Sequence, residues 1–167
     1  DPFSIAPLPD LYSPLEQADL GSIRAMITPD LGSAAMSNAY RSIFAERSGL
    51  FRHHFAAAID ASPDFTEGDN CFEVLRGVNF VAAHGARVRD HRNDLSPNVV
   101  DNVDRGLAYS LANVAEAHLQ QSRIARAWLD LFEDIDVVIC PAASSTPFPH
   151  DQWSVGEIDG KAMETYM

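Results

Sequence analysis

The stretch DVVICPAASSTPFP, residues 136–149, begins with residues typical of a β-strand and continues with residues typical of a rigid loop. Residues 137–140 form a short apolar run rich in β-branched residues, with Asp136 before it and Pro141 after it. Such a run predicts a short, fully buried strand. A buried strand that opens into a loop of alanine, serine, threonine and proline can deliver that loop to a pocket at its carboxyl end. The alternative is an ordinary core strand followed by a surface loop.

The composition limits the class of protein and its partners. A chain of 167 residues, 46% of them hydrophobic, is long enough to bury a core and predicts a single domain over 1–167. It carries 24 acidic and 12 basic residues, a formal net charge of -12. A surface this acidic repels nucleic acid phosphates and anionic lipids, so we expect neither nucleic acid nor membrane as a partner.

The cysteines and the apolar runs bear on the compartment. Cys71 and Cys140 are the only two cysteines and both lie in apolar runs, so we expect two buried free thiols and a reducing compartment. No apolar run approaches the length of about 18 residues that a membrane span needs, and no signal peptide is recognised. These features predict a cytoplasmic protein. The chain starts at Asp1 and stops at Met167 just after a turn signal, so we expect a section of a longer chain.

The first 63 residues predict an extended connector and then a strand–helix–strand unit. Residues 1–20 contain four prolines and little periodicity. In the unit 21–63 we expect a strand at 23–28, a turn at 29–32, a helix from Asn38 to about residue 54 capped by Ser37, and a strand at 57–61. This order predicts parallel pairing of the two strands. The four small residues around 56–58 and 61 also suit a helix, which remains the alternative for the second strand.

The region 69–134 predicts two long helices. One runs from about 69 to 89, and Ser96-Pro97 marks the start of the other. A 3.6-residue apolar period then continues to about Asp134, which predicts one long helix unless it breaks near Gly106. This helix leads directly into the strand at 136–140. We expect the remainder, 136–167, to be a strand plus loop, with a turn at Asp159-Gly160.

No complete catalytic apparatus is found in the residues. None of the six histidines has metal-ligand spacing, no cysteine pair has zinc spacing, and neither a Gly-x-Ser-x-Gly elbow nor a Ser-x-x-Lys motif occurs. No glycine-rich loop that could hold a phosphate is present. Ser144 and Ser145 are candidate nucleophiles by type, but loop hydroxyls that bond to nearby backbone are the more common arrangement.

Six segments, taken in order, resemble the part of an amidase-signature hydrolase that follows its signature region. The resemblance extends over essentially the whole chain, from the first segment at residue 1 to the last at residue 167. The segments are the Asp-Pro segment at 1–4, SIRAMITPDLG at 22–32, the helix at 38–51, AAAIDASPDF at 56–65, the long helix running into DVVICPA at 110–142, and IDGKAMETYM at 158–167. The resemblance implies an α/β fold, a helix-rich fragment in which part of a mixed β-sheet is flanked by helices.

The resemblance implies a catalytic mechanism but no catalytic residue in this chain. Family members hydrolyse amides with a Ser–cis-Ser–Lys triad in which the lysine comes first in the chain, and they need no metal or organic cofactor. Here Lys161 is the only lysine, no serine follows it, and the glycine- and serine-rich block is absent. Cys140 and Ala142 also replace threonines that are usual around Pro141 in the family.

A supporting role therefore follows from the resemblance: scaffold and wall of the acyl-substrate pocket. The implied substrate-binding residues are Pro141 and Ala142, after the strand, and Arg105, because some relatives hold a substrate carboxylate with an arginine near this part of the helix. The alternative for Arg105 is a solvated helix charge, the usual placement of arginine.

We therefore expect part of an amidase that hydrolyses carboxamide C–N bonds through an acyl-serine, inactive as this chain alone. The expected partners are a small-molecule amide substrate and the remainder of the amidase chain. Unpaired strand edges and an uncovered apolar face would also favour self-association. The alternative is a non-catalytic helical binding or assembly module, which an acidic surface and a long amphipathic helix would serve equally well.

Overall fold

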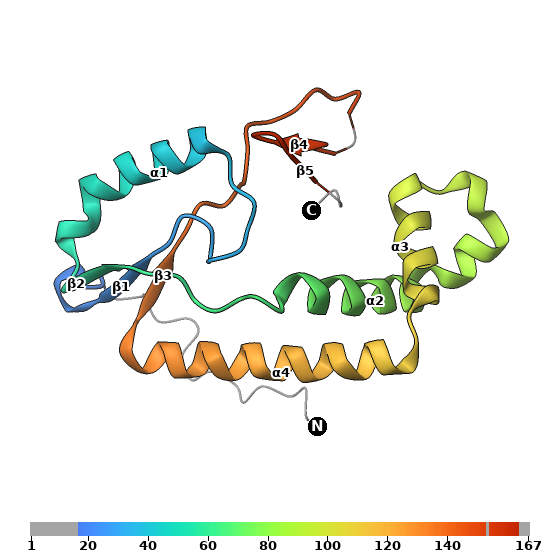
Figure 1. The fold of residues 1–167 in the computed structure, drawn as a ribbon, viewed down its shortest axis with the longest axis horizontal. Coiled ribbons are helices and arrows are strands. Elements are labelled where there is room, and N and C mark those ends of the chain that lie inside the picture. Colours follow the sequence, from blue (N-terminus) through green and yellow to red (C-terminus); the bar gives the residue numbers. More distant parts are fainter. Residues whose placement is uncertain (1–16, 153, 164–167) are drawn as a thin grey trace.

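The structure is a computed structural model that describes residues 17–152 and 154–163 (Figure 1). The expected Asp-Pro segment at 1–4 and most of the expected connector lie outside the described residues. The elements are β1 (Arg24–Ile27), α1 (Asn38–Phe51), β2 (Ala57–Asp60), α2 (Gly68–His91), α3 (Pro97–Ala108), α4 (Leu111–Asp134), β3 (Val137–Ile139), β4 (Glu157–Ile158) and β5 (Lys161–Ala162). Short 3₁₀ turns occupy Leu20–Ser22, Arg52–His54 and Arg92–Asp94. No helix in the described part of the chain is long and apolar enough to cross a membrane.

A three-stranded parallel sheet organises the first and last thirds of the chain. Its order is β2-β1-β3, with Ala25 opposite Ala58 on one side and Val137 on the other. α1 lies on one side of this sheet and the end of α4 that leads into β3 lies on the other, while α2 runs alongside α4 beyond the ends of the strands (Figure 1). The predicted strands, their parallel pairing and the Ser37 cap are confirmed: Ser37 Oγ accepts a hydrogen bond from Tyr40 N at the start of α1. Within the described residues the sheet is parallel throughout, and the antiparallel pair β4–β5 is separate from it.

The prediction of a fully buried strand at 137–140 is wrong. β1 is buried along most of its length because it is the central strand, whereas all three residues of β3 are only half-buried. β3 is an edge strand of the described sheet, so only one of its edges is paired. Cys140, which follows it, is exposed, while Cys71 is buried on α2. The prediction of free thiols is confirmed, but the prediction that both are buried holds for Cys71 alone.

The predicted long helix over 97–134 is two helices. α3 ends at Ala108, Tyr109 and Ser110 are extended, and α4 begins at Leu111. Ser110 starts α4 with a capping box, because its hydroxyl accepts from Asn113 N while the Asn113 side chain accepts from Ser110 N. Gly106 lies inside α3. The helical conformation is interrupted three to four residues later, at Tyr109 and Ser110, where Ser110 can cap the next helix.

A charged contact joins the start of the central strand to the start of β3. Arg24 donates from Nη2 to Asp136 Oδ1 at 2.9 Å and from its backbone N to Oδ2 at 2.7 Å, and its Nη1 reaches the carbonyl oxygen of Glu133. The side-chain and then the backbone hydrogen bonds from Arg24 lower the pKa of Asp136 to about 2. The contact fixes the position where α4 passes into β3.

Because the folded-state pKa of Asp136 is below its unfolded value, its charge stabilises the fold at neutral pH. That contribution is present above about pH 4 and is lost as the pH falls towards 2. We expect Asp136→Asn to lower the melting temperature at pH 7, and we expect the gap between the variant and the parent chain to close as the pH approaches 2. Thermal melts followed by circular dichroism from pH 2 to pH 7 measure this. A gap that stays the same at every pH would show that the charge of Asp136 does not contribute.

Candidate functional site

The carboxyl ends of the three parallel strands open onto the same edge of the sheet, where ligands bind in many α/β folds. The loop after β1 leads into α1, the loop after β2 leads into α2, and residues 140–149 follow β3. The chain leaves β1 by way of α1 on one side of the sheet and reaches β3 by way of α4 on the other (Figure 1). This topology therefore places a candidate ligand site in a crevice next to the central strand, β1.

Thr28, at the end of β1, forms hydrogen bonds that connect the carboxyl ends of the three strands. Its side chain is fully buried, and its backbone N donates to the carbonyl oxygen of Ile139 at 3.0 Å. Thr28 Oγ1 lies 2.7 Å from Ser62 Oγ and accepts from Leu31 N at 3.0 Å. The turn predicted at 29–32 is confirmed: Leu31 and Gly32 have φ values of 53° and 87°. A Cβ at Gly32 would lie 2.9 Å from the carbonyl oxygen of Pro63, so this close approach requires glycine.

The start of α1 is held by residues far along the chain. Ser37 N donates to the carbonyl oxygen of Ser144 at 2.8 Å. Asn38 N donates to Asp159 Oδ2 at 2.5 Å, which places a carboxylate at the positive end of the helix. Asp159 and Gly160 have φ values of 49° and 83°, so the turn predicted there is confirmed. These contacts bring the loop after β3 and the β4–β5 hairpin against α1.

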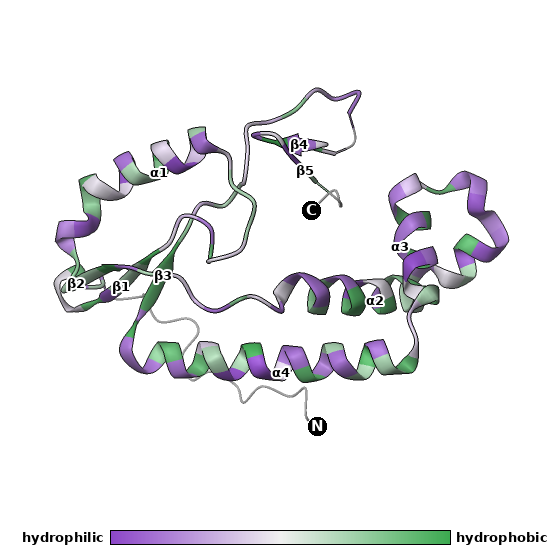
Figure 2. Cartoon of the chain, viewed as in Figure 1, coloured by the Kyte–Doolittle hydropathy of each residue, from purple (hydrophilic) through white to green (hydrophobic). Residues whose placement is uncertain are grey.

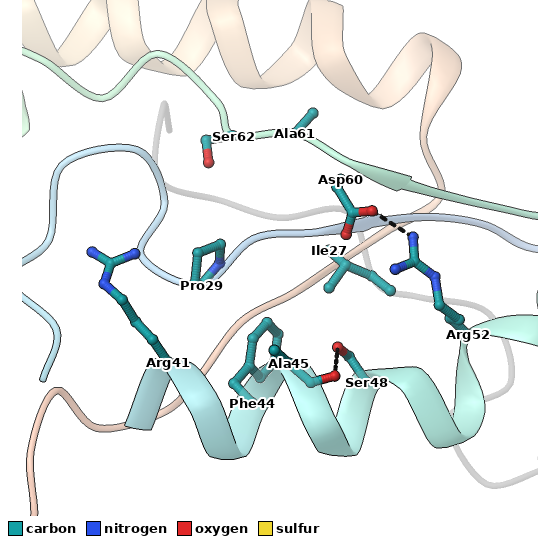
Figure 3. A pocket seen from close by; sticks show the side chains of 10 residues that line it. All are labelled: Ile27, Pro29, Arg41, Phe44, Ala45, Ser48, Arg52, Asp60, Ala61 and Ser62. Carbon is teal, nitrogen blue, oxygen red and sulfur yellow. Dashed lines mark hydrogen bonds and ion pairs between the residues drawn. The ribbon is translucent and has the colours of Figure 1, made fainter. Parts of the chain in front are cut away.

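A cavity of about 500 Å³ lies between α1 and the ends of β1 and β2 (Figure 3). Ile27 from β1 and Phe44 from α1 line it with apolar side chains from its two sides. Arg52 pairs with Asp60 at 2.7 Å at one end of it, and Arg41 pairs with Asp30 at 2.5 Å at the other. Burial tends to raise the pKa of Asp30, but hydrogen bonds from Gly32 N and Arg41 outweigh it and hold that pKa below its usual range. Each arginine is therefore matched by a carboxylate, and the cavity carries no net charge from these pairs.

A second cavity, of about 310 Å³, lies between the loop after β1 and the β4–β5 hairpin. Arg41 lines both cavities, and Asp30 and Lys161, the single lysine of the chain, line the second one. The lysine predicted to have no catalytic role is thus beside the crevice. Among the described residues, no hydrogen bond joins a serine hydroxyl to the side chain of a lysine or a histidine, so the described crevice holds no serine–base pair.

Ser144 and Ser145 keep structural roles in the described contacts. Ser144 contributes its carbonyl oxygen to Ser37, and Ser145 Oγ donates to the neighbouring carbonyl oxygen of Thr146 at 3.3 Å. The bond at Ser145 is the local backbone contact that the sequence favoured for these hydroxyls. Within the described ranges no group of three histidine, cysteine, aspartate or glutamate residues could hold a metal ion.

The structure does not bring the predicted substrate-binding residues together. Pro141 and Ala142 follow β3 at the crevice edge of the sheet, although neither lines the two cavities. Arg105 lies on α3, at the far end of α4 from β3 (Figure 1). There it is exposed and pairs with Glu73 at 3.4 Å and with Asp101 at 3.8 Å. Its role as a substrate ligand stays a prediction.

Sequence reasoning passed over the residues that build the crevice. The patterns in the sequence do not distinguish Arg41, Arg52 or Thr28 as site residues, and at Asp159 they predict only a turn. A weak signal exists for Thr28, a polar residue between an apolar run and a proline. The contact of Asp159 with Asn38 joins residues 121 positions apart, and no local sequence pattern predicts it.

No family model matches the sequence, and no curated protein is similar to it in sequence. Solved structures do match the fold. A bacterial aryl acylamidase of the amidase signature enzymes family superposes with a TM-score of 0.73 at 12% identity, over 87% of this chain and 33% of its own. A second structure, an amidase, superposes with a TM-score of 0.73 at 16% identity, over 90% of this chain and 34% of its own. The chain therefore has the fold of a section of the amidase-signature enzymes and spans about a third of their length.

Proposed function

We propose that this chain is the section of an amidase that follows its lysine- and serine-bearing region. The parent reaction is hydrolysis of a carboxamide C–N bond in a small molecule, with an acyl-serine intermediate and no metal or organic cofactor. One observation carries the proposal: about nine-tenths of this chain superposes on a third of two amidases with a TM-score of 0.73. The identities of 12% and 16% support a shared fold, and the activity is the inference built on it.

In this proposal the chain supplies scaffold and pocket wall, and the remainder of the amidase chain supplies the nucleophile, the base and the oxyanion donors. The free edge of β3 supports such a junction, because a strand with only apolar side chains is typical of the interior of a larger sheet. The loop that begins with Pro141 and Ala142 leaves that strand at the crevice edge. Residues on this loop would then face the acyl group of the substrate. Two free thiols, one of them exposed, fit a cytoplasmic location.

A second function, a non-catalytic helical binding or assembly module, is favoured by one observation. The outer face of α4 exposes Leu111, Leu119 and Leu129, and such a face is a common docking surface for another helix. This function needs no lysine or serine elsewhere in the protein. The two functions therefore make opposite predictions about the sequence that adjoins the chain.

Reading the coding frame upstream of Asp1 separates the two functions. The amidase proposal expects a lysine followed by a glycine- and serine-rich block with two serines, because the base and the nucleophile must precede this section. An upstream region without these residues, or an unrelated one, would refute the amidase proposal and favour the module. The position of the lysine before both serines is the specific feature to check, since isolated serines are common in any sequence.

A further inference from the structure

A stripe of uncharged residues runs along the exposed face of α4. It consists of positions alternately three and four residues apart, which lie on one side of a helix: Leu111, Ala115, His118, Ser122, Ala125 and Leu129. All six are exposed, with Leu111 at 86% and Leu129 at 70% of the area they would show in a free chain. We refer to these six residues as the outer stripe of α4.

Within residues 17–152 and 154–163, the outer stripe takes no part in the packing of α4 against α2. α4 contacts α2 through its opposite face, where Ala117 and Gln120 are buried. Gln120 Oε1 accepts from Asn70 on α2, and the Cys71 thiol donates to the carbonyl oxygen of Ala117. In Figure 1 no described element lies over the side of α4 that faces away from α2, and Figure 2 shows hydrophobic segments recurring along the length of α4. A helix with two apolar faces has one to offer to another molecule.

The outer stripe is complementary to a second copy of itself in an antiparallel arrangement. If Leu111 of one copy meets Leu129 of the other, the same register places Ala115 opposite Ala125 and His118 opposite Ser122. Large residues then face large ones at the two ends, small residues face small ones inside them, and the polar residues meet in the middle. Every layer occurs twice, as a two-fold axis near residue 120 requires.

The residues beside the stripe fit the same register. Leu119, which is 56% exposed, falls close to the two-fold axis and so lies beside its own counterpart in the second copy. Gln121 lies on the other flank and likewise comes close to its own counterpart. Arg126 falls opposite Ala112. No two like charges meet along the seam, although the chain as a whole carries a formal charge of -12.

We propose that two copies of this chain associate through an antiparallel pairing of their α4 helices along the outer stripe. A seam of one helix per copy is a small interface, so the dimer has a dissociation constant in the micromolar range. Because each copy is strongly acidic, added salt screens their repulsion and strengthens the dimer. This inference does not depend on the amidase proposal.

Sedimentation velocity of the 167-residue chain across a concentration series tests the proposal. We expect a monomer–dimer equilibrium that shifts towards dimer in higher salt. Leu129→Glu places a carboxylate against Leu111 at both ends of the seam and weakens the dimer by about a hundredfold or more. The matched control is Leu50→Glu, on α1 and 61% exposed, which leaves the dimer unchanged. A chain that stays monomeric, or equal effects of the two variants, would overturn the proposal.

Cysteine cross-linking tests the register. In a Cys140→Ser background, which removes the exposed thiol, the pair Ala115→Cys with Ala125→Cys forms intermolecular disulfides when an oxidant such as diamide accepts the electrons and protons of the thiols. Each single variant stays uncross-linked, because its two copies are about 15 Å apart along the seam and a disulfide needs about 4.4–6.8 Å between Cα atoms. Cross-linking of a single variant would indicate a parallel dimer. No cross-linking of the pair in a chain that dimerises would place the interface elsewhere. Either result contradicts the antiparallel pairing.

Discussion

Gly106→Ala is expected to destabilise the chain by about 2–3 kcal/mol and to lower its melting temperature by about 5–10 °C. A Cβ added at Gly106 would lie 2.3 Å from the carbonyl oxygen of Gly77 on α2 and 2.7 Å from Val81 Cγ2. The first of these atoms belongs to a helix backbone and cannot rotate away. α2 and α3 would have to separate, and the packing around the fully buried Val103 would open with them.

Gly49→Ala is the matched control, because it makes the same substitution inside another helix. A Cβ at Gly49 on α1 meets no atom within 4 Å. Alanine there reduces the conformational freedom of the unfolded chain and should stabilise the fold by about 0.4–1 kcal/mol. Urea unfolding of the two variants and the parent chain measures both effects. A Gly106→Ala protein as stable as the parent would mean that α2 and α3 do not approach as closely as the structure shows.

Gly106 also bears on the difference between the predicted single helix and the observed pair α3 and α4. The apolar period continues from Val99 to Phe132, so periodicity alone predicts one helix, and Gly106 is its weakest position by propensity. In the structure Gly106 is inside α3, where tertiary contact with α2 outweighs propensity. The break comes at Ser110, whose cap with Asn113 is a local signal that could have been recognised.

The strands were predictable because short apolar runs and turn residues bound them. Their burial was not, because burial depends on what lies beside and above a strand. Residues 137–139 have the composition of an interior strand, yet β3 has one free edge in the described sheet and is only half-buried. The exposure of Cys140 has the same cause. A sequence can mark a segment as suited to the interior without showing whether its neighbour is present.

The sequence predicted one of the loops beside the crevice, but not the residues that form it, and the substrate-binding role of Pro141, Ala142 and Arg105 stays a prediction. The loop after β3 does lie at the carboxyl ends of parallel strands, as its sequence indicated. The contacts that shape the crevice join Thr28 to Ser62, Ser37 to Ser144 and Asn38 to Asp159, each across a long stretch of chain. Such pairings follow from the topology of the sheet and hairpin, which single-sequence patterns do not specify.

The second large effect concerns catalysis, and we expect it to be all or none. A serine hydroxyl is a weak nucleophile unless a base or a lowered pKa activates it. In the described crevice, the hydroxyl of Ser145 bonds to the backbone of Thr146, and no lysine or histidine side chain is hydrogen-bonded to a serine hydroxyl. The 167-residue chain should therefore hydrolyse no amide, whereas a longer protein from the same coding frame that adds the lysine and the two serines should do so.

The most direct measurement is amide hydrolysis by three purified proteins: the 167-residue chain, the longer protein, and the longer protein with the nucleophilic serine changed to alanine. Aryl, fatty and glutamine-type amides serve as substrates, with a mock preparation as the background. We predict turnover by the longer protein, a loss of about a thousandfold or more in the serine variant, and no turnover above background by the 167-residue chain. Turnover by the 167-residue chain, or a longer protein that hydrolyses none of the three amide classes, would contradict the proposal.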